Sequence, residues 1–306
     1  MRGRRTRALT IIGTILVLLA TAQPATAAHR TPGGSGHAFE HYVALGDSYT
    51  AGPLIPMLRL ESLGCARSTG NYPTLLALRL RVRSFTDVSC SGADTTHLTR
   101  PQTTLGTNPP QLDALRPGTD LVTLGIGGND DSVFGRLVGT CPGLRESDPA
   151  GAPCREHFTV DGVDTLKAAV TTTGRKVAAV LDEIHARAPR ATVLVVGYPR
   201  IVPPHGTCPA ILPFADGDYA WLDSIETALN DAIEAAVAED GRSSFVDTYP
   251  ASLGHDACAG RHAWIQGQHT NPLVAASYHP RFAGMLGVAN EVERVLSSRA
   301  ALPAGR

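Results

Sequence analysis

The sequence lacks any excess of positive charge. Its 306 residues contain 27 lysines and arginines against 28 aspartates and glutamates, and the formal net charge is −1. Proteins that bind nucleic acids or anionic membranes through charge carry a basic patch or a long basic tail, and the sequence shows neither pattern. We therefore expect no nucleic-acid partner.

Low-complexity linkers and internal repeats are also absent, so nothing in the sequence divides the chain into two domains. There is no C-x-x-C pair, which argues against a zinc or redox site built on cysteines. The six cysteines form an even set, and in an exported chain such a set predicts three disulfides. The sequence alone does not choose among the pairings. We favour the sequential one, because each bridge then closes a local loop: Cys65–Cys90, Cys141–Cys154 and Cys208–Cys258.

The first 28 residues have the order of a secretory signal peptide. Four arginines are followed by an apolar run from Ala8 to Ala22 and by the small-residue cleavage step Ala25-Thr26-Ala27. The apolar run is short for a membrane span, which needs about 20 residues; an uncleaved N-terminal anchor is the alternative. We expect a secreted, extracellular protein without stable membrane insertion, with a signal peptide over residues 1–28 and one domain over residues 29–306.

Apolar, β-branched runs predict strands, and longer amphipathic patterns between or after them predict helices. The strands are expected at 42–46, 84–89, 121–125, 192–197 and 244–247, and the helices at 72–81, 163–187, 219–239 and 281–298. This alternation is typical of an α/β fold with a parallel sheet and helices on both faces. Active sites in such folds lie at the carboxyl ends of the strands.

Ser48 stands directly after the first predicted strand, in the run Gly46-Asp47-Ser48-Tyr49-Thr50. A serine on a strand-to-helix turn can expose its hydroxyl as a nucleophile and turn its own N–H toward an oxyanion. The alternative role is a helix N-cap, which is common for serine. The run is not G-x-S-x-G and follows the first strand rather than a central one, so it does not match the α/β-hydrolase elbow.

Gly92 and Asn129 follow the second and third predicted strands. Gly92 could bring a backbone N–H close to a substrate oxygen, although an ordinary turn glycine needs no such role. Asn129, in Gly125-Ile126-Gly127-Gly128-Asn129-Asp130, could donate its side-chain amide to an oxyanion or could cap a glycine-rich turn. The loop lacks the lysine of a phosphate-binding loop. With the N–H of Ser48, these two residues predict an oxyanion hole.

His279 stands near the end of the chain, in Ser277-Tyr278-His279-Pro280, just before the last predicted helix. Proline suits the first helical turn, so His279 is expected at the entry of that helix. With Ser48, Gly92, Asn129 and His279 in this order, the sequence over about residues 40–290 resembles the GDSL, or SGNH, hydrolase family. It is most similar to secreted actinobacterial esterases, lipases and phospholipases with three disulfides. The resemblance implies a flavodoxin-like three-layer α/β/α sandwich with a five-stranded parallel sheet, and ester hydrolysis by Ser48.

One position departs from the pattern of that family. Many members carry an aspartate three residues before the histidine, where this sequence has Ala276. A carboxylate there would orient the imidazole and stabilise its charged form. We expect a backbone carbonyl of Ala276 or Ser277 to hold Nδ1–H instead, as in some relatives of this type. Asp247 and Asp256 are the alternative sources of a carboxylate.

We therefore predict a secreted serine carboxylic-ester hydrolase, an esterase or lipase with Ser48 as nucleophile and His279 as base, and with no cofactor or metal. Its partner would be a small-molecule or lipid ester, and we expect a monomer. The alternatives are a carbohydrate-ester deacetylase and a non-catalytic secreted binding module on the same fold.

Two further segments have less specific patterns. The apolar stretch 53–58 follows Ser48 and either lines an acyl pocket or packs in the core. His255, His262 and His269, with Asp256, lack the spacing of metal ligands on a helix or strand, and we interpret them as part of a loop.

Overall fold

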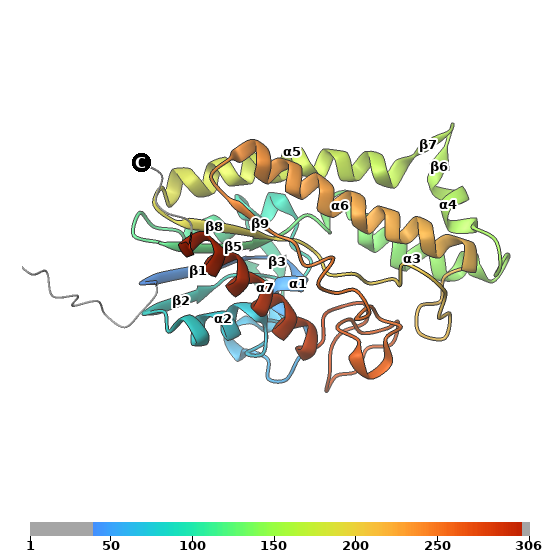
Figure 1. The fold of residues 1–306 in the computed structure, drawn as a ribbon, viewed down its shortest axis with the longest axis horizontal. Coiled ribbons are helices and arrows are strands. Elements are labelled where there is room, and N and C mark those ends of the chain that lie inside the picture. Colours follow the sequence, from blue (N-terminus) through green and yellow to red (C-terminus); the bar gives the residue numbers. More distant parts are fainter. Residues whose placement is uncertain (1–38, 302–306) are drawn as a thin grey trace, which may run out of the picture. The chain divides into compact units, whose positions relative to one another are not determined.

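The sheet is built from short runs of apolar residues, the central three of which are almost wholly buried. The computed structural model describes residues 39–301, which belong to one unit of the chain, residues 36–306; the expected signal peptide lies outside the described residues. The strands of the sheet are β1 (His41–Gly46), β2 (Ser84–Asp87), β5 (Leu121–Gly125), β8 (Thr192–Val196) and β9 (Ser244–Val246). They lie in the order β2-β1-β5-β8-β9, and every neighbouring pair is parallel (Figure 1).

Helices cover both faces of this sheet, as Figure 1 shows. On one face lie α5 (Thr165–Arg187) and α6 (Tyr219–Asp240), and on the other lie α2 (Tyr72–Leu80) and α7 (Phe282–Ala301). Side chains alternate along a strand. Val43 of β1 therefore packs in the core under α5 and α6, whereas Tyr42 packs in the core under α2 and α7. The predicted α/β/α sandwich with a five-stranded parallel sheet is confirmed.

The helix boundaries follow from local capping. The side chain of Asn71 accepts the N–H of Thr74 at 3.1 Å and begins α2, and Asp164 begins α5 in the same way. Gly241, with φ of 64°, ends α6 in the left-handed conformation that glycine adopts most easily. Pro280 lies two residues before α7 rather than in its first turn, because it pairs with Ile265 in a β-bridge.

The sequence analysis did not predict several shorter elements. The helices are α1 (Ser48–Ala51), α3 (Val133–Arg145) and α4 (Pro153–Phe158), and the hairpin strands are β3 (Gln102–Thr104), β4 (Gly106–Asn108), β6 (Thr159–Val160) and β7 (Val163–Asp164). Short 3-10 helices span Leu60–Cys65, Thr95–Leu98, Gln111–Ala114, Asp130–Ser132, Asp216–Asp218 and Gly260–His262. The pattern of α3 is hard to recognise because it contains three glycines and Pro142, the poorest helix formers.

The cysteines are joined in sequential pairs in the structure: Cys65–Cys90, Cys141–Cys154 and Cys208–Cys258. The first bridge ties the segment after α1 to the loop after β2. The second ties α3 to α4, so the helix with the weakest helix-forming sequence is bonded covalently to its neighbour. No helix within residues 39–301 is long and apolar enough to cross a membrane.

Candidate active site

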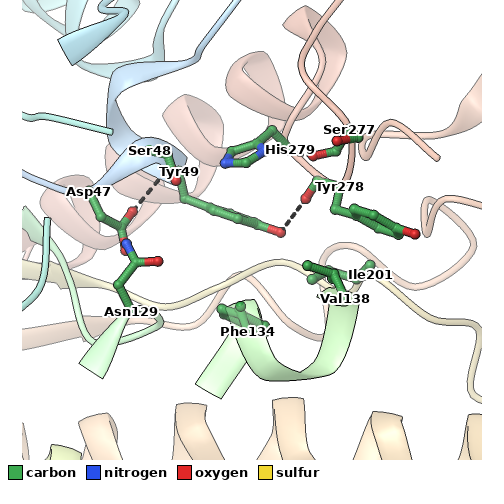
Figure 2. Close-up of a pocket in the computed structure, with 11 residues that line it drawn as sticks. Asp47, Ser48, Tyr49, Asn129, Phe134, Val138, Ile201, Ser277, Tyr278 and His279 are labelled. Carbon is green, nitrogen blue, oxygen red and sulfur yellow. Dashed lines mark hydrogen bonds between the residues drawn. The ribbon is translucent and has the colours of Figure 1, made fainter. Parts of the chain in front are cut away.

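A cavity of about 410 Å³ lies at the carboxyl ends of β1, β5 and β8. This volume is in the range of small-molecule sites. Its lining comes from segments far apart in the sequence, and Figure 2 shows most of them. The lining residues are Asp47, Ser48, Tyr49, Asn129, Phe134, Gly135, Val138, Ile201, Ser277, Tyr278 and His279. The structure thus brings three of the four residues expected from the sequence, Ser48, Asn129 and His279, to one cavity.

Ser48 is the first residue of α1, on the turn that follows β1. The cap of this helix is Asp47, whose carboxylate accepts the N–H of Tyr49 at 2.8 Å, so Ser48 is not the N-cap. Ser48 is only 7% exposed, yet it lines the cavity. The N–H of Ser48 donates to no other residue in the described part of the chain, which leaves it free for a ligand.

His279 lines the same cavity, next to the ring of Tyr49 at a centroid distance of 5.5 Å. Its Nδ1 lies 2.7 Å from the backbone oxygen of Ser277. A carbonyl can only accept a hydrogen bond, so Nδ1 carries the proton and Nε2 is left as the basic nitrogen. Burial lowers the pKa of His279 below its ordinary value of 6.5, and the hydrogen bond to Ser277 opposes this shift.

The two aspartates considered as partners of His279 are engaged elsewhere. Asp247 accepts the N–H of Tyr249 at 3.1 Å, and Asp256 accepts the N–H of Cys258 at 2.9 Å. Neither lines the cavity. Ser48 and His279 themselves share the cavity without a direct hydrogen bond in the structure; such bonds often tighten only when substrate binds.

Asn129 follows β5 and reaches across to the loop after β2. Its Nδ2 donates to the backbone oxygen of Ala93 at 2.8 Å. Because a carbonyl cannot donate, this contact identifies the amide nitrogen, and one of its two N–H groups stays available. The amide is therefore held in place by the residue that directly follows Gly92.

Gly92 is exposed and is not part of the cavity lining. It has φ of 77°, a conformation that favours glycine. Its N–H donates to no residue between 39 and 301. The structure thus places Gly92 beside the site, through its neighbour Ala93, rather than in the cavity wall.

Asp47, adjacent to Ser48, keeps its carboxyl inside a hydrogen-bond network. Besides the N–H of Tyr49, it accepts the hydroxyl of Tyr198, which follows β8. Burial raises the pKa of Asp47 to about 7, and the two hydrogen bonds oppose the shift. The sequence analysis gave no role to either Asp47 or Tyr198.

The apolar wall of the cavity comes from segments that the sequence analysis had not connected with the site. Phe134 and Val138, one turn apart on α3, lie opposite Ser48 and His279 together with Ile201 (Figure 2). Their i, i+4 spacing is a helical signal, but the glycines of α3 obscure it. The stretch 53–58 lines no part of this cavity, so the idea that it forms the acyl pocket is wrong. Within it, Ile55 packs in the core and Met57 is 73% exposed.

Of the other three C-terminal histidines, His255 and His269 lie in loops, as expected, whereas His262 is the last residue of a short 3-10 helix. The Nδ1 of His255 is bonded to the backbone oxygen of His262 at 2.7 Å, and the His255 ring stacks on Trp264. No cluster of metal-ligating side chains occurs in the described residues.

The chain is similar to known proteins in both sequence and fold. Residues 44–285 match the model of the GDSL-like lipase/acylhydrolase family. The chain is 39% identical over 271 residues to Lipase 2 of Streptomyces coelicolor, covering 87% of this chain and 88% of that protein.

Two solved structures are also similar. One is phospholipase A1 from Streptomyces albidoflavus, with 32% identity and a TM-score of 0.70 over 85% of this chain and 99% of that one. The other is an extracellular lipase from Streptomyces rimosus, with 28% identity and a TM-score of 0.63 over 83% of this chain and 99% of that one.

Proposed function

Because this chain belongs to the GDSL-like lipase/acylhydrolase family and is a carboxylic-ester hydrolase, we propose that Ser48 is its nucleophile and His279 its general base. The observation that carries the proposal is the meeting of these two side chains in one cavity, with the Nδ1–H of His279 held by the Ser277 carbonyl. This arrangement leaves Nε2 to accept the serine proton.

The reaction follows the two steps of acyl transfer. Ser48 Oγ attacks the acyl carbon while His279 takes its proton, and the proton then passes to the departing alcohol. A water molecule, activated by the same imidazole, hydrolyses the acyl-enzyme. The oxyanion of each tetrahedral intermediate would be held by the N–H groups of Ser48 and Gly92 and by the amide of Asn129.

The cavity wall indicates which acyl groups the site favours. Phe134, Val138 and Ile201 form an apolar surface opposite Ser48 and His279, without a charged side chain among them. Burial of hydrocarbon against such a surface contributes about 0.8 kcal/mol per CH₂ group. We infer that the substrates are esters of aliphatic or aromatic acids, bound with the acyl chain along this wall.

A fluorophosphonate probe tests the nucleophile directly, because it phosphonylates activated serines. The purified protein should be labelled on the peptide that contains Ser48. A series of p-nitrophenyl esters of increasing acyl length, measured on the same preparation, should show kcat/KM rising with chain length. Absence of labelling, or labelling of another serine, would refute the assignment.

Loss of the Asn129 amide is expected to lower kcat strongly. If the amide holds the oxyanion, Asn129→Ala should reduce kcat by about 10²–10³-fold. The matched control is Gln268→Ala, which removes an amide that donates to the Ala210 carbonyl at 3.1 Å and lies outside the cavity lining. That variant should keep near wild-type kcat. A change confined to KM in Asn129→Ala would assign the amide to substrate binding instead.

The acid limb of the pH profile should reflect the buried position of His279. The imidazole must be neutral to accept the serine proton, and its pKa lies below 6.5. Neutral imidazole therefore persists to lower pH than in an exposed histidine, and the acid midpoint of kcat/KM should fall below 6.5.

The control for this profile is Asp47→Asn. It removes a carboxyl adjacent to Ser48 whose pKa burial raises to about 7. The midpoint should stay below 6.5 even if the rate falls. A midpoint that disappears in Asp47→Asn would assign the titration to Asp47.

We also propose that the protein is exported. Residues 1–28 have the pattern of a signal peptide, and six paired cysteines are typical of chains that fold in oxidising compartments. A similar solved structure is that of an extracellular lipase. Mass analysis of culture medium should find a chain that begins at residue 28 or 29.

A further inference from the structure

The hydroxyl of Tyr198 lies between the two segments that carry Ser48 and Asn129. It donates to the Asp47 carboxylate, one residue before Ser48, and accepts the N–H of Gly128 at 2.8 Å, one residue before Asn129. A single oxygen atom thus connects the turn after β1 with the turn after β5. The three segments meet because their strands are neighbours in the sheet, in the order β1-β5-β8.

Tyr198 is itself held firmly in place. Its N–H donates to Oδ1 of Asn230 on α6 at 2.8 Å, and its carbonyl accepts Nδ2 of the same residue at 3.1 Å. The Tyr198 ring packs edge-on against the ring of Tyr49 at 5.1 Å. The position of the hydroxyl is therefore fixed by α6 and by the ring of Tyr49.

The glycine at position 128 allows this close approach. A Cβ atom there would lie 3.2 Å from the Cζ of Tyr198 and 2.6 Å from ring atoms of Phe134. No side chain fits without displacing both rings, so the N–H of Gly128 can reach the hydroxyl only because the residue has no side chain.

We propose that Tyr198 is a positioning residue of this ester hydrolase, which sets the oxyanion loop of Asn129 against the turn of Ser48. The inference rests on the proposed roles of Ser48 and Asn129. Tyr198 is 3% exposed and does not line the cavity, so it acts through the residues that do. A misplacement of about 1 Å between a nucleophile and an oxyanion donor can cost about 10²-fold in rate.

The first test compares two tyrosines with the same type of bond. Tyr198→Phe removes only the hydroxyl. In the control, Tyr249→Phe, the tyrosine lies just after β9. Its hydroxyl donates to the Asp223 carboxylate on α6 at 2.6 Å and contacts neither turn. With kcat referred to sites titrated by fluorophosphonate, Tyr198→Phe should lose about 10- to 100-fold with KM little changed. Tyr249→Phe should keep the wild-type kcat, although each variant loses the hydrogen bonds of a tyrosine hydroxyl.

The second test asks whether Tyr198 acts through the oxyanion loop. The Asn129→Ala variant has no side-chain amide for the loop to position. Adding Tyr198→Phe to it should therefore lower kcat by less than about threefold. Phenylboronic acid, which forms a tetrahedral adduct with a nucleophilic serine, should bind Tyr198→Phe more weakly in proportion to its loss of kcat/KM.

The outcomes separate this inference from the proposed function. If the wild-type protein is not labelled at Ser48, the proposed function fails and with it the role of Tyr198. If Ser48 is labelled but Tyr198→Phe keeps its kcat, the inference alone is overturned. Equal losses from Tyr198→Phe with and without Asn129 would also overturn it, because a tyrosine that only stabilises the fold produces no such coupling.

Discussion

Replacing Ser48 by alanine is expected to lower kcat by about 10⁶-fold, since loss of the nucleophile in a serine enzyme leaves only binding and oxyanion stabilisation. The folded structure should persist. The α1 cap is supplied by Asp47 rather than by Ser48, and alanine is a good helix former at the first position of α1. Hydrolysis of p-nitrophenyl esters and the unfolding temperature, measured on the same preparation, check both statements.

The matched control for this variant is Ser224→Ala. The hydroxyl of Ser224 donates to the Trp221 carbonyl on α6 and lies outside the cavity lining. Its loss should leave turnover unchanged and should leave fluorophosphonate labelling intact, whereas Ser48→Ala should lose both. Wild-type turnover in purified Ser48→Ala protein would refute the nucleophile assignment.

Replacing His279 by alanine is expected to have an effect of the same order, about 10⁶-fold in kcat, because nucleophile and base act as a unit. The matched control is His255→Ala. The Nδ1 of His255 is also bonded to a backbone carbonyl at 2.7 Å, so the two variants lose similar local contacts. Only the loss of His279 should affect the reaction.

Two aspartate variants, assayed in the same way, test whether a carboxylate acts with Ser48 and His279. Removal of a triad carboxylate can cost about 10⁴-fold in kcat. Here Asp247→Asn and Asp256→Asn should keep most of the activity, because asparagine still offers the oxygen that caps the Tyr249 and Cys258 N–H groups. The carbonyl of Ser277 belongs to the backbone and cannot be deleted by a side-chain mutation. A collapse of kcat in either correctly folded variant would show that a distant carboxylate orients His279.

The strands and long helices could be predicted from the sequence because their signals are local. Thr192–Val196 is a continuous β-branched and apolar run, and in the structure it is a strand buried on both faces. Asp164 and Gly241 mark helix ends through interactions within a few residues. In contrast, α3 carries Pro142 and three glycines, and its position against the rest of the fold depends on the Cys141–Cys154 bridge and on burial of Val133 and Leu137. Such contacts are not visible in a local pattern.

The candidate site also has parts that could be predicted from the sequence and parts that could not. Ser48 and Asn129 each follow a predicted strand, and parallel strands end at one edge of a sheet, so their meeting in the cavity could be inferred from topology, as could the place of Gly92 beside it. The sequence could also say that His279 lacks an aspartate at position 276. It left open whether Ala276 or Ser277 supplies the carbonyl, because that choice depends on the turn at Tyr278, whose φ is 61°.

The sequence by itself determined the order of the strands and long helices along the chain and the residues that we propose for ester hydrolysis. Only the tertiary structure decided that Phe134, Val138 and Ile201 face Ser48 and His279, that the stretch 53–58 does not, and that the Tyr198 hydroxyl joins two turns. The physical reason is the range of the interactions. Hydrophobic periodicity and capping act over a few residues, whereas a cavity wall and a shared hydrogen bond depend on distant segments that meet only when the sheet and its helices have packed.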